Sequence, residues 1–127
     1  MSTTAAFASI VAPDLAQLTD ANTNRDGTGT VVMVSTGATD GDRIDDIELC
    51  AAGTVTDGVI RLYISDGTNT RLVKEVLVSA TTPSTTQAVW SVKLLNLGWL
   101  IKTNWLLKAS THNAETFNIY VSRKGSF

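Results

Sequence analysis

Short turn signals at regular intervals constrain the fold of this chain more than any other feature. Each separates runs rich in valine, isoleucine, leucine or threonine. The signals are Asp26-Gly27, Asp40-Gly41, Asp57-Gly58, Asp66-Gly67 and Thr82-Pro83-Ser84. Asp-Gly favours tight hairpin turns, and many short strands joined by such turns are typical of an all-β sandwich or barrel.

The segment 53–80 contains the clearest predicted hairpin. Its apolar residues occupy every second position on both sides of Asp66-Gly67, so one face is expected to point inward and the other to stay partly wet. The inward residues are Ile60, Leu62, Ile64, Leu72, Val76 and Val78. Further strands are predicted from Thr30, from Arg43, from Thr86 and from Thr116, the last with Phe117, Ile119 and Val121 inward.

Two places interrupt this alternation. Ile44 is out of phase with Ile47, and a β-bulge near Asp45-Asp46 would restore the phase. In 94–108 the apolar residues fall near helical spacing, but Gly98 and Thr103-Asn104 favour strands that end near Leu97 and Lys102, then a turn and a strand from Trp105 to Ser110.

The first 28 residues differ from the rest. Residues 3–12 could form an edge strand, Pro13 could begin one helical turn over 13–18, and 19–29 is a polar loop. We therefore predict two parts: an N-terminal arm, 1–28, and a β-sandwich domain, 29–127. The sandwich is expected to be antiparallel and jelly-roll-like, with about eight strands.

Composition excludes several classes of partner. A net charge of -2 gives no broad positive field, so nucleic acid is not expected as a partner. No stretch reaches the apolar length of a membrane span, and the first residues lack the pattern of a signal peptide, so no membrane association is expected. Cys50 is the single cysteine, and its apolar surroundings favour a small buried hydrophobe.

The stretch 109–117, read ASTHNAETF, contains the single histidine, His112. Ser110 or Thr111 could act as a nucleophile, but neighbours on a strand point to opposite faces, and no nucleophile motif is present. We interpret Thr111 to Glu115 as a hairpin loop in which Asn113 tolerates positive φ. A small hydrolase using His112 is the alternative, and no enzymatic activity is expected.

Two acidic segments could bind a cation. Oxygen-bearing side chains alternate over Asp20–Asp26 as in a calcium loop, but the required glycine and glutamate are replaced by Arg25 and Val31. The second cluster, which could also supply a carboxylate pair for glycosidic cleavage, comprises Asp40, Asp42, Asp45 and Asp46, with Arg43 among them. Both are interpreted as polar loops or turns, and no metal, cofactor or small-molecule substrate is expected.

The aromatic residues leave two alternatives open. Trp90, Trp99 and Trp105, with Tyr63 and Tyr120, could form a platform for a sugar ring. Aromatic residues flanked by aliphatic ones more often belong to a core or a subunit interface. Exposed tryptophans would favour a glycan-binding or host-adhesion module of a phage tail or fibre, and buried ones a structural protein.

The runs 41–84 and 107–122 resemble a small β-sandwich protein that many tailed bacteriophages encode among their virion genes. The recurring pieces are Gly41 to Ile44, the hairpin AGTVTDGVIRLYISDG, the Thr82 to Ser84 turn and the ASTHNAETF loop. The resemblance implies a decoration or cement protein of jelly-roll-like fold. Such a protein is located on the virion, is usually a homotrimer, and binds the outside of the major capsid protein shell.

A strap-like arm would suit that role. The arm is too short to bury its own apolar residues, so we expect them to pack on a neighbouring subunit or on the shell. The predicted partner-binding residues are Phe7, Ile10, Val11, Leu15 and Leu18, together with Trp99 and Trp105.

Overall fold

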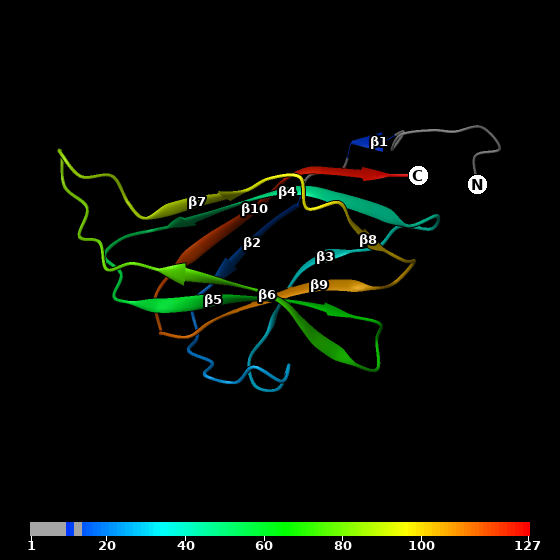
Figure 1. Cartoon of the computed structure of the whole chain (residues 1–127), viewed down its shortest axis with the longest axis horizontal. Coiled ribbons are helices and arrows are strands. Elements are labelled where there is room, and N and C mark those ends of the chain that lie inside the picture. The colour runs from blue at the N-terminus through cyan, green and yellow to red at the C-terminus, as the bar shows by residue number, and fades with distance from the viewer. Residues whose placement is uncertain (1–9, 12–13) are drawn as a thin grey trace.

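The structure is a computed structural model that describes residues 10–11 and 14–127, and this part of the chain contains ten β-strands and no helix (Figure 1). The strands are β1 (Ile10–Val11), β2 (Asp14–Leu18), β3 (Val32–Thr36), β4 (Asp42–Ala51), β5 (Gly58–Ser65), β6 (Thr70–Val78), β7 (Ser91–Leu94), β8 (Trp99–Ile101), β9 (Leu106–Thr111) and β10 (Phe117–Ser126). The predicted all-β class is confirmed.

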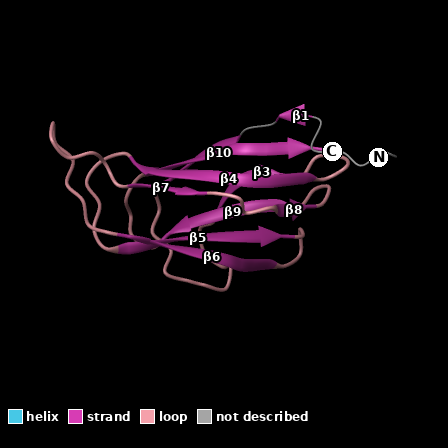
Figure 2. Ribbon diagram, turned by 45° about the horizontal axis from the view of Figure 1, so that its top comes forward, coloured by secondary structure: helices cyan, strands magenta, loops and turns pink. Residues whose placement is uncertain are grey.

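The strands form two antiparallel sheets packed face to face (Figure 2). Sheet A has the order β1-β10-β4-β7, with β2 also paired to β10 and β8 also paired to β4. Sheet B has the order β3-β9-β5-β6. Because β2, β3, β4 and β5 alternate between the sheets, and β9 and β10 return between them, the topology is that of a jelly roll.

The core lies between the two sheets and contains the predicted inward residues Ile60, Leu62, Val76 and Val78, with Ile64 packed against it. The inward prediction for Leu72 is wrong, because the register shifts between Leu62 and Tyr63 and Leu72 pairs with the outward-pointing Tyr63. Ile60 and Leu62 of β5 and Ile119 of β10 belong to one core cluster, and all three are 0% exposed. Trp90 packs edge to face on Phe117, with ring centroids 5.7 Å apart. The alternation of side chains along each strand therefore selects which face enters the core.

The predicted β-bulge in β4 is confirmed. Glu48 pairs with Tyr120, Asp46 with Arg123 and Ile44 with Lys124, so the register shifts on both sides of Asp46. The register skips Asp45, which allows Ile44 and Ile47 both to be fully buried.

The segment 94–108 forms strands, as predicted, although β7 already ends at Leu94. Asn104 turns the chain from β8 into β9 with a φ of 66°. Asparagine is one of the few residues besides glycine that adopts this left-handed conformation readily.

The N-terminal region differs from the expectation. The predicted helical turn is wrong, because Asp14–Leu18 forms β2, which pairs with β10 from Leu18↔Phe117 to Asp14↔Val121. Hydrogen bonding along β10 and burial of Leu18, which is 1% exposed, outweigh the helical preference of so short a segment. Residues 14–18 thus belong to the sandwich, whereas the domain division had assigned them to the arm; residues 1–9 and 12–13 lie outside the described residues.

Candidate functional site

The loop after β9 is stabilised by hydrogen bonds to the loop before β5. Glu115 Oε2 accepts hydrogen bonds from the Thr56 N–H and hydroxyl, at 2.8 and 2.9 Å. Asn113 Nδ2 donates to Thr56 Oγ1 and to the Asp57 carbonyl. The polar loop is confirmed, but the predicted hairpin is wrong, because β9 belongs to sheet B and β10 to sheet A, so the loop crosses between the sheets. The predicted positive φ at Asn113 is also wrong, since Asn96 and Asn104 are the non-glycine residues with positive φ among those described.

The described neighbour of the His112 imidazole is the guanidinium of Arg61, not a hydroxyl that could act as a nucleophile. Its backbone N–H donates to the Val59 carbonyl, and its Nδ1 lies 3.2 Å from Arg61 Nη2. An arginine N–H can donate to this nitrogen only when it carries no proton. The Thr111 hydroxyl donates to the Asn113 carbonyl at 2.9 Å.

Arg61 is the centre of a network that the sequence analysis missed. Its side chain is 1% exposed, although it points to the outer face of sheet B. Nε donates to Glu75 Oε2 at 3.0 Å, and Nη1 donates to the Asn22 carbonyl at 3.1 Å. Nearby, the Tyr63 hydroxyl donates to the Asn24 carbonyl at 2.9 Å. The loop 19–31 therefore lies over β5 and buries two outward side chains that were expected to be partly wet.

The two arginines of this network favour the ionised form of Glu75. A hydrogen bond from Arg25, with a further one from Arg61, holds the pKa of Glu75 below its usual value. Arg61 and Glu75 are also register partners in β5 and β6. An arginine opposite a glutamate in the predicted hairpin was the signal that could have identified this pair.

The candidate calcium loop uses its oxygens for internal hydrogen bonds. Asn22 Oδ1 accepts from the Asn24 N–H, and Asp26 Oδ1 accepts from the N–H and the hydroxyl of Thr28. The two hydrogen bonds from Thr28 lower the pKa of Asp26. Over the described ranges, no group of three histidine, cysteine or acidic residues is placed to hold a metal ion.

The second acidic cluster is dispersed by the fold. Asp45 accepts a hydrogen bond from Arg43 at 2.8 Å, and Asp46 accepts one from the Asn96 N–H at 3.0 Å. Asp42 instead points between the sheets and is 1% exposed. There it lies 3.1 Å from Nζ of Lys124. Asp42, Asp45 and Asp46 are therefore each held by a separate partner within the protein.

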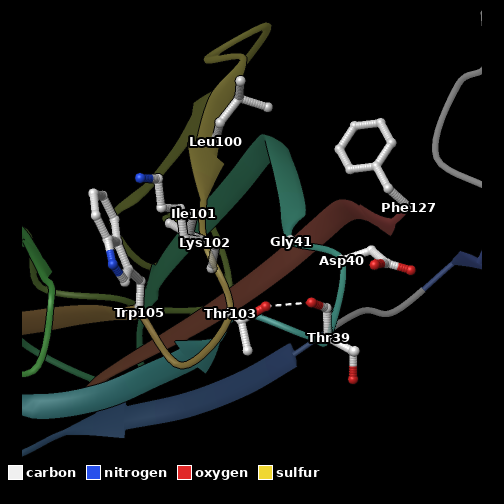
Figure 3. A pocket seen from close by; sticks show the side chains of 9 residues that line it. All are labelled: Thr39, Asp40, Gly41, Leu100, Ile101, Lys102, Thr103, Trp105 and Phe127. Atoms are coloured by element: carbon white, nitrogen blue, oxygen red, sulfur yellow. Dashed lines mark hydrogen bonds between the residues drawn. The ribbon is translucent and has the colours of Figure 1, made fainter. Parts of the chain in front are cut away.

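An open groove lies at the end of the sandwich where β8 turns into β9 (Figure 3). It has a volume of about 690 Å³ and is mostly apolar. The lining residues are Thr39, Asp40, Gly41, Leu100, Ile101, Lys102, Thr103, Trp105 and Phe127. Leu100 is 65% exposed, Trp105 is half-buried, and Lys102 lies over the Trp105 ring at 5.6 Å. The Thr103 hydroxyl donates to the carbonyls of Ala38 and Thr39, so it stabilises the rim.

The structure does not gather the predicted partner-binding residues at one place. Phe7 lies outside the described residues, as do the side chains of Ile10 and Val11 in β1. Leu15 is 75% exposed on the outer face of sheet A, whereas Leu18 belongs to the core. These two leucines therefore have different roles.

The two predicted tryptophans also separate. Trp99 is half-buried against the core, and Trp105 lines the groove. Leu100 and Phe127, which line the same groove and are exposed, were missed by sequence reasoning. An outward apolar residue at the end of a strand is not marked by the alternation of apolar residues in the sequence. It therefore cannot be distinguished from an ordinary apolar surface residue by sequence alone.

No protein-family model, curated protein or solved structure matches this chain. In the described part of the chain, no helix is long and apolar enough to cross a membrane.

Proposed function

We propose that this protein is a structural virion component that binds the outer surface of a phage capsid and stabilises the shell across capsomer boundaries. The observation that carries the proposal is the apolar groove at the β8–β9 end. Its Leu100 and Phe127 side chains, 65% and 39% exposed, are available for burial against a partner. Exposed apolar side chains gathered at one place are typical of interaction sites.

The position of the groove supports attachment at this end. Figure 1 and Figure 2 place β1, β8 and the C-terminus at the same end of the sandwich. Ile10 of β1 pairs with Ser126, the residue before Phe127. The arm proposed as a strap is therefore connected to the sandwich beside the groove, and contacts at both would reinforce each other.

The polar clusters that we described fit a structural role. Arg61, Asp26 and Glu115 each form hydrogen bonds within the protein and hold loops on the sandwich. A decoration protein needs such rigidity, because many modest contacts repeated by symmetry provide avidity without catalysis. Assembly as a homotrimer on the major capsid protein is part of the proposal.

A glycan-binding or host-adhesion module is the second candidate. Trp105, Asp40 and Thr103 line the same groove, and an aromatic ring in a groove with polar groups is a common way to bind a sugar. Lys102, however, already lies over the ring. The half-buried state of Trp99 and Trp105 favours the structural role over the glycan platform.

The test is to titrate undecorated phage heads with purified protein, pellet the heads and count bound copies. We expect saturation at a fixed copy number related to the shell symmetry, with greater resistance of the heads to heat. Leu100→Asp should reduce occupancy at least tenfold. The matched control is Leu77→Asp, since Leu77 is 76% exposed on β6, away from the groove.

Other outcomes would redirect or refute the proposal. No binding to heads, with binding to cells or glycans instead, would support the adhesion module. Equal occupancy by both variants would exclude the groove. To test the arm, deletion should be limited to residues 2–9, because removal up to Asp26 would also delete β2 and part of the loop over Arg61.

A further inference from the structure

A lysine and two carboxylates form a charged cluster between the sheets, which we call the Lys124 triad: Lys124, Asp14 and Asp42. The Lys124 side chain is 6% exposed and that of Asp42 is 0% exposed, whereas the Asp14 side chain is 33% exposed. Nζ lies 2.8 Å from Asp14 Oδ2 and 3.1 Å from Asp42 Oδ2. The three residues come from β10, β2 and β4, adjacent strands of sheet A.

Stability alone does not account for this arrangement. Removing charged groups from water costs free energy, and replacing a buried ion pair by well-packed apolar residues is often neutral or stabilising. Lys124 nevertheless enters the interior at a place where β10 has just supplied Ile119 and Val121 to the core. A nearly buried amine that the fold holds against two carboxylates is a candidate for a reaction between these groups.

The geometry is that of an amine beside an acyl carbon. Because a carboxylate C–O bond is about 1.2 Å long, Nζ lies no farther than about 4 Å from Cγ of Asp14. Reacting groups held at such separations gain a large effective concentration. We propose that Lys124 and Asp14 condense to an isopeptide bond that joins β10 to β2, with Asp42 as the catalytic base and acid.

The reaction balances without any co-reactant. Asp42 accepts a proton from the Lys124 ammonium, and the neutral amine attacks Cγ of Asp14 to form a tetrahedral intermediate. Asp42 then transfers protons from the nitrogen to one Asp14 oxygen, the C–O bond breaks, and that oxygen leaves as water. The ammonium and the carboxylate thus become one amide and one water, and Asp42 ends as a carboxylate.

Neighbouring groups act as positioning residues for the triad. The Ser35 hydroxyl donates to Asp14 Oδ2 at 2.6 Å, which places Asp14 from the opposite sheet. The Ser126 hydroxyl donates to Asp42 Oδ1 at 2.5 Å, and the Ala38 N–H donates to Asp42 Oδ2 at 3.0 Å. Both carboxylates are therefore held in fixed orientations around one nitrogen, as proton transfer at that nitrogen requires.

The bond would join Asp14 to Lys124, which are 110 positions apart, and so enclose most of the chain in a covalent loop. Cross-links between distant residues restrict the unfolded chain most. The cross-link is independent of the proposed function, since it concerns the interior of the sandwich and neither the groove nor a partner.

Intact mass spectrometry of the purified full chain tests the proposal directly. We expect a mass lower than the sequence mass by one water molecule. Trypsin cleaves after Arg25, Arg43 and Arg123, so a bond to Asp14 should join peptide 1–25 to peptide 124–127. A full mass in the folded protein would overturn the proposal. A link from 124–127 to peptide 26–43 would overturn the assignment of Asp14 as the acyl partner.

Two variants test the roles within the triad. In Asp14→Asn the leaving group becomes ammonia, so the deficit should change from one water to one ammonia. In Asp42→Asn the base is lost, and the folded variant should keep its full mass. Circular dichroism checks folding, and an unchanged deficit of one water in folded Asp42→Asn would exclude Asp42 as the catalytic residue.

Discussion

Nε of Arg61 lies 3.0 Å from Oε2 of Glu75, its register partner on the neighbouring strand. The ion pair lies on the outer face of sheet B, yet the Arg61 side chain is only 1% exposed. Arg61 is buried because the loop 19–31 covers it and provides the Asn22 carbonyl as a further acceptor. Arg25, from the same loop, donates to the same glutamate oxygen at 2.9 Å. A single glutamate thus joins a strand and a loop.

Arg61→Leu should lower the free energy of unfolding by about 2 kcal/mol, because the Asn22 carbonyl loses its donor and Glu75 loses its buried partner. The matched control is Arg25→Leu, whose side chain is 65% exposed and which should lower the free energy of unfolding much less than Arg61→Leu does. Urea denaturation at neutral pH measures both. Equal effects of the two variants would show that burial of Arg61 contributes nothing.

Acid should destabilise the protein through three carboxylates. Backbone hydrogen bonds from Asn69 and Thr68 lower the pKa of Asp66, and the pKa values of Asp26 and Glu75 are lowered as described above. A carboxylate whose pKa is lower in the folded state than in the unfolded state stabilises the fold when it is ionised. Its contribution is complete above the ordinary pKa, 3.8 for aspartate and 4.5 for glutamate. The contribution is lost as the pH falls through the lowered pKa of the folded state.

The measurement is the urea midpoint as a function of pH from neutral to strongly acidic solution. It should decline below about pH 4.5. Asp66→Asn keeps the turn acceptor but cannot ionise, so its midpoint should decline less steeply than that of the natural chain. Identical pH profiles would contradict a contribution from Asp66.

Gly37→Ala should destabilise the protein by about 2 kcal/mol through overpacking. A Cβ at Gly37 would lie 1.9 Å from the Lys102 carbonyl oxygen, and Gly37 is hydrogen-bonded to Trp105 and Asn104 at the groove. Gly53→Ala is the control, since a Cβ there has no atom within 4 Å. Thermal unfolding compares the two, and a neutral Gly37→Ala would mean that β3 and the turn after β8 separate easily.

Leu18→Ala should cost about 3 kcal/mol, because it removes a fully buried side chain from the core. Leu15→Ala, three residues earlier in β2, should cost less than about 0.5 kcal/mol, since Leu15 is 75% exposed. Denaturant unfolding measures both. A small effect at Leu18 would show that residues 14–18 behave as an independent arm rather than as a strand of the sandwich.

Local patterns in the sequence were sufficient for most strands after residue 30 and for the direction of most of their side chains, but not for β2. Asp-Gly turns defined the β5–β6 hairpin, and the phase break between Ile44 and Ile47 located the bulge at Asp45. These predictions succeeded because turn chemistry and period-two burial are properties of neighbouring residues.

Only the tertiary structure decided the role of residues whose partners lie far along the chain. Asp14 and Lys124, 110 positions apart, meet because β2 and β10 are neighbours, and Arg61 is buried because a loop 39 positions away in the sequence lies over it. The same reason explains why Leu18 is core and Leu15 is surface, although both seemed suited to an arm. Strand order is set by the free energy of the whole sandwich, so contacts that depend on it have no local signal in the sequence.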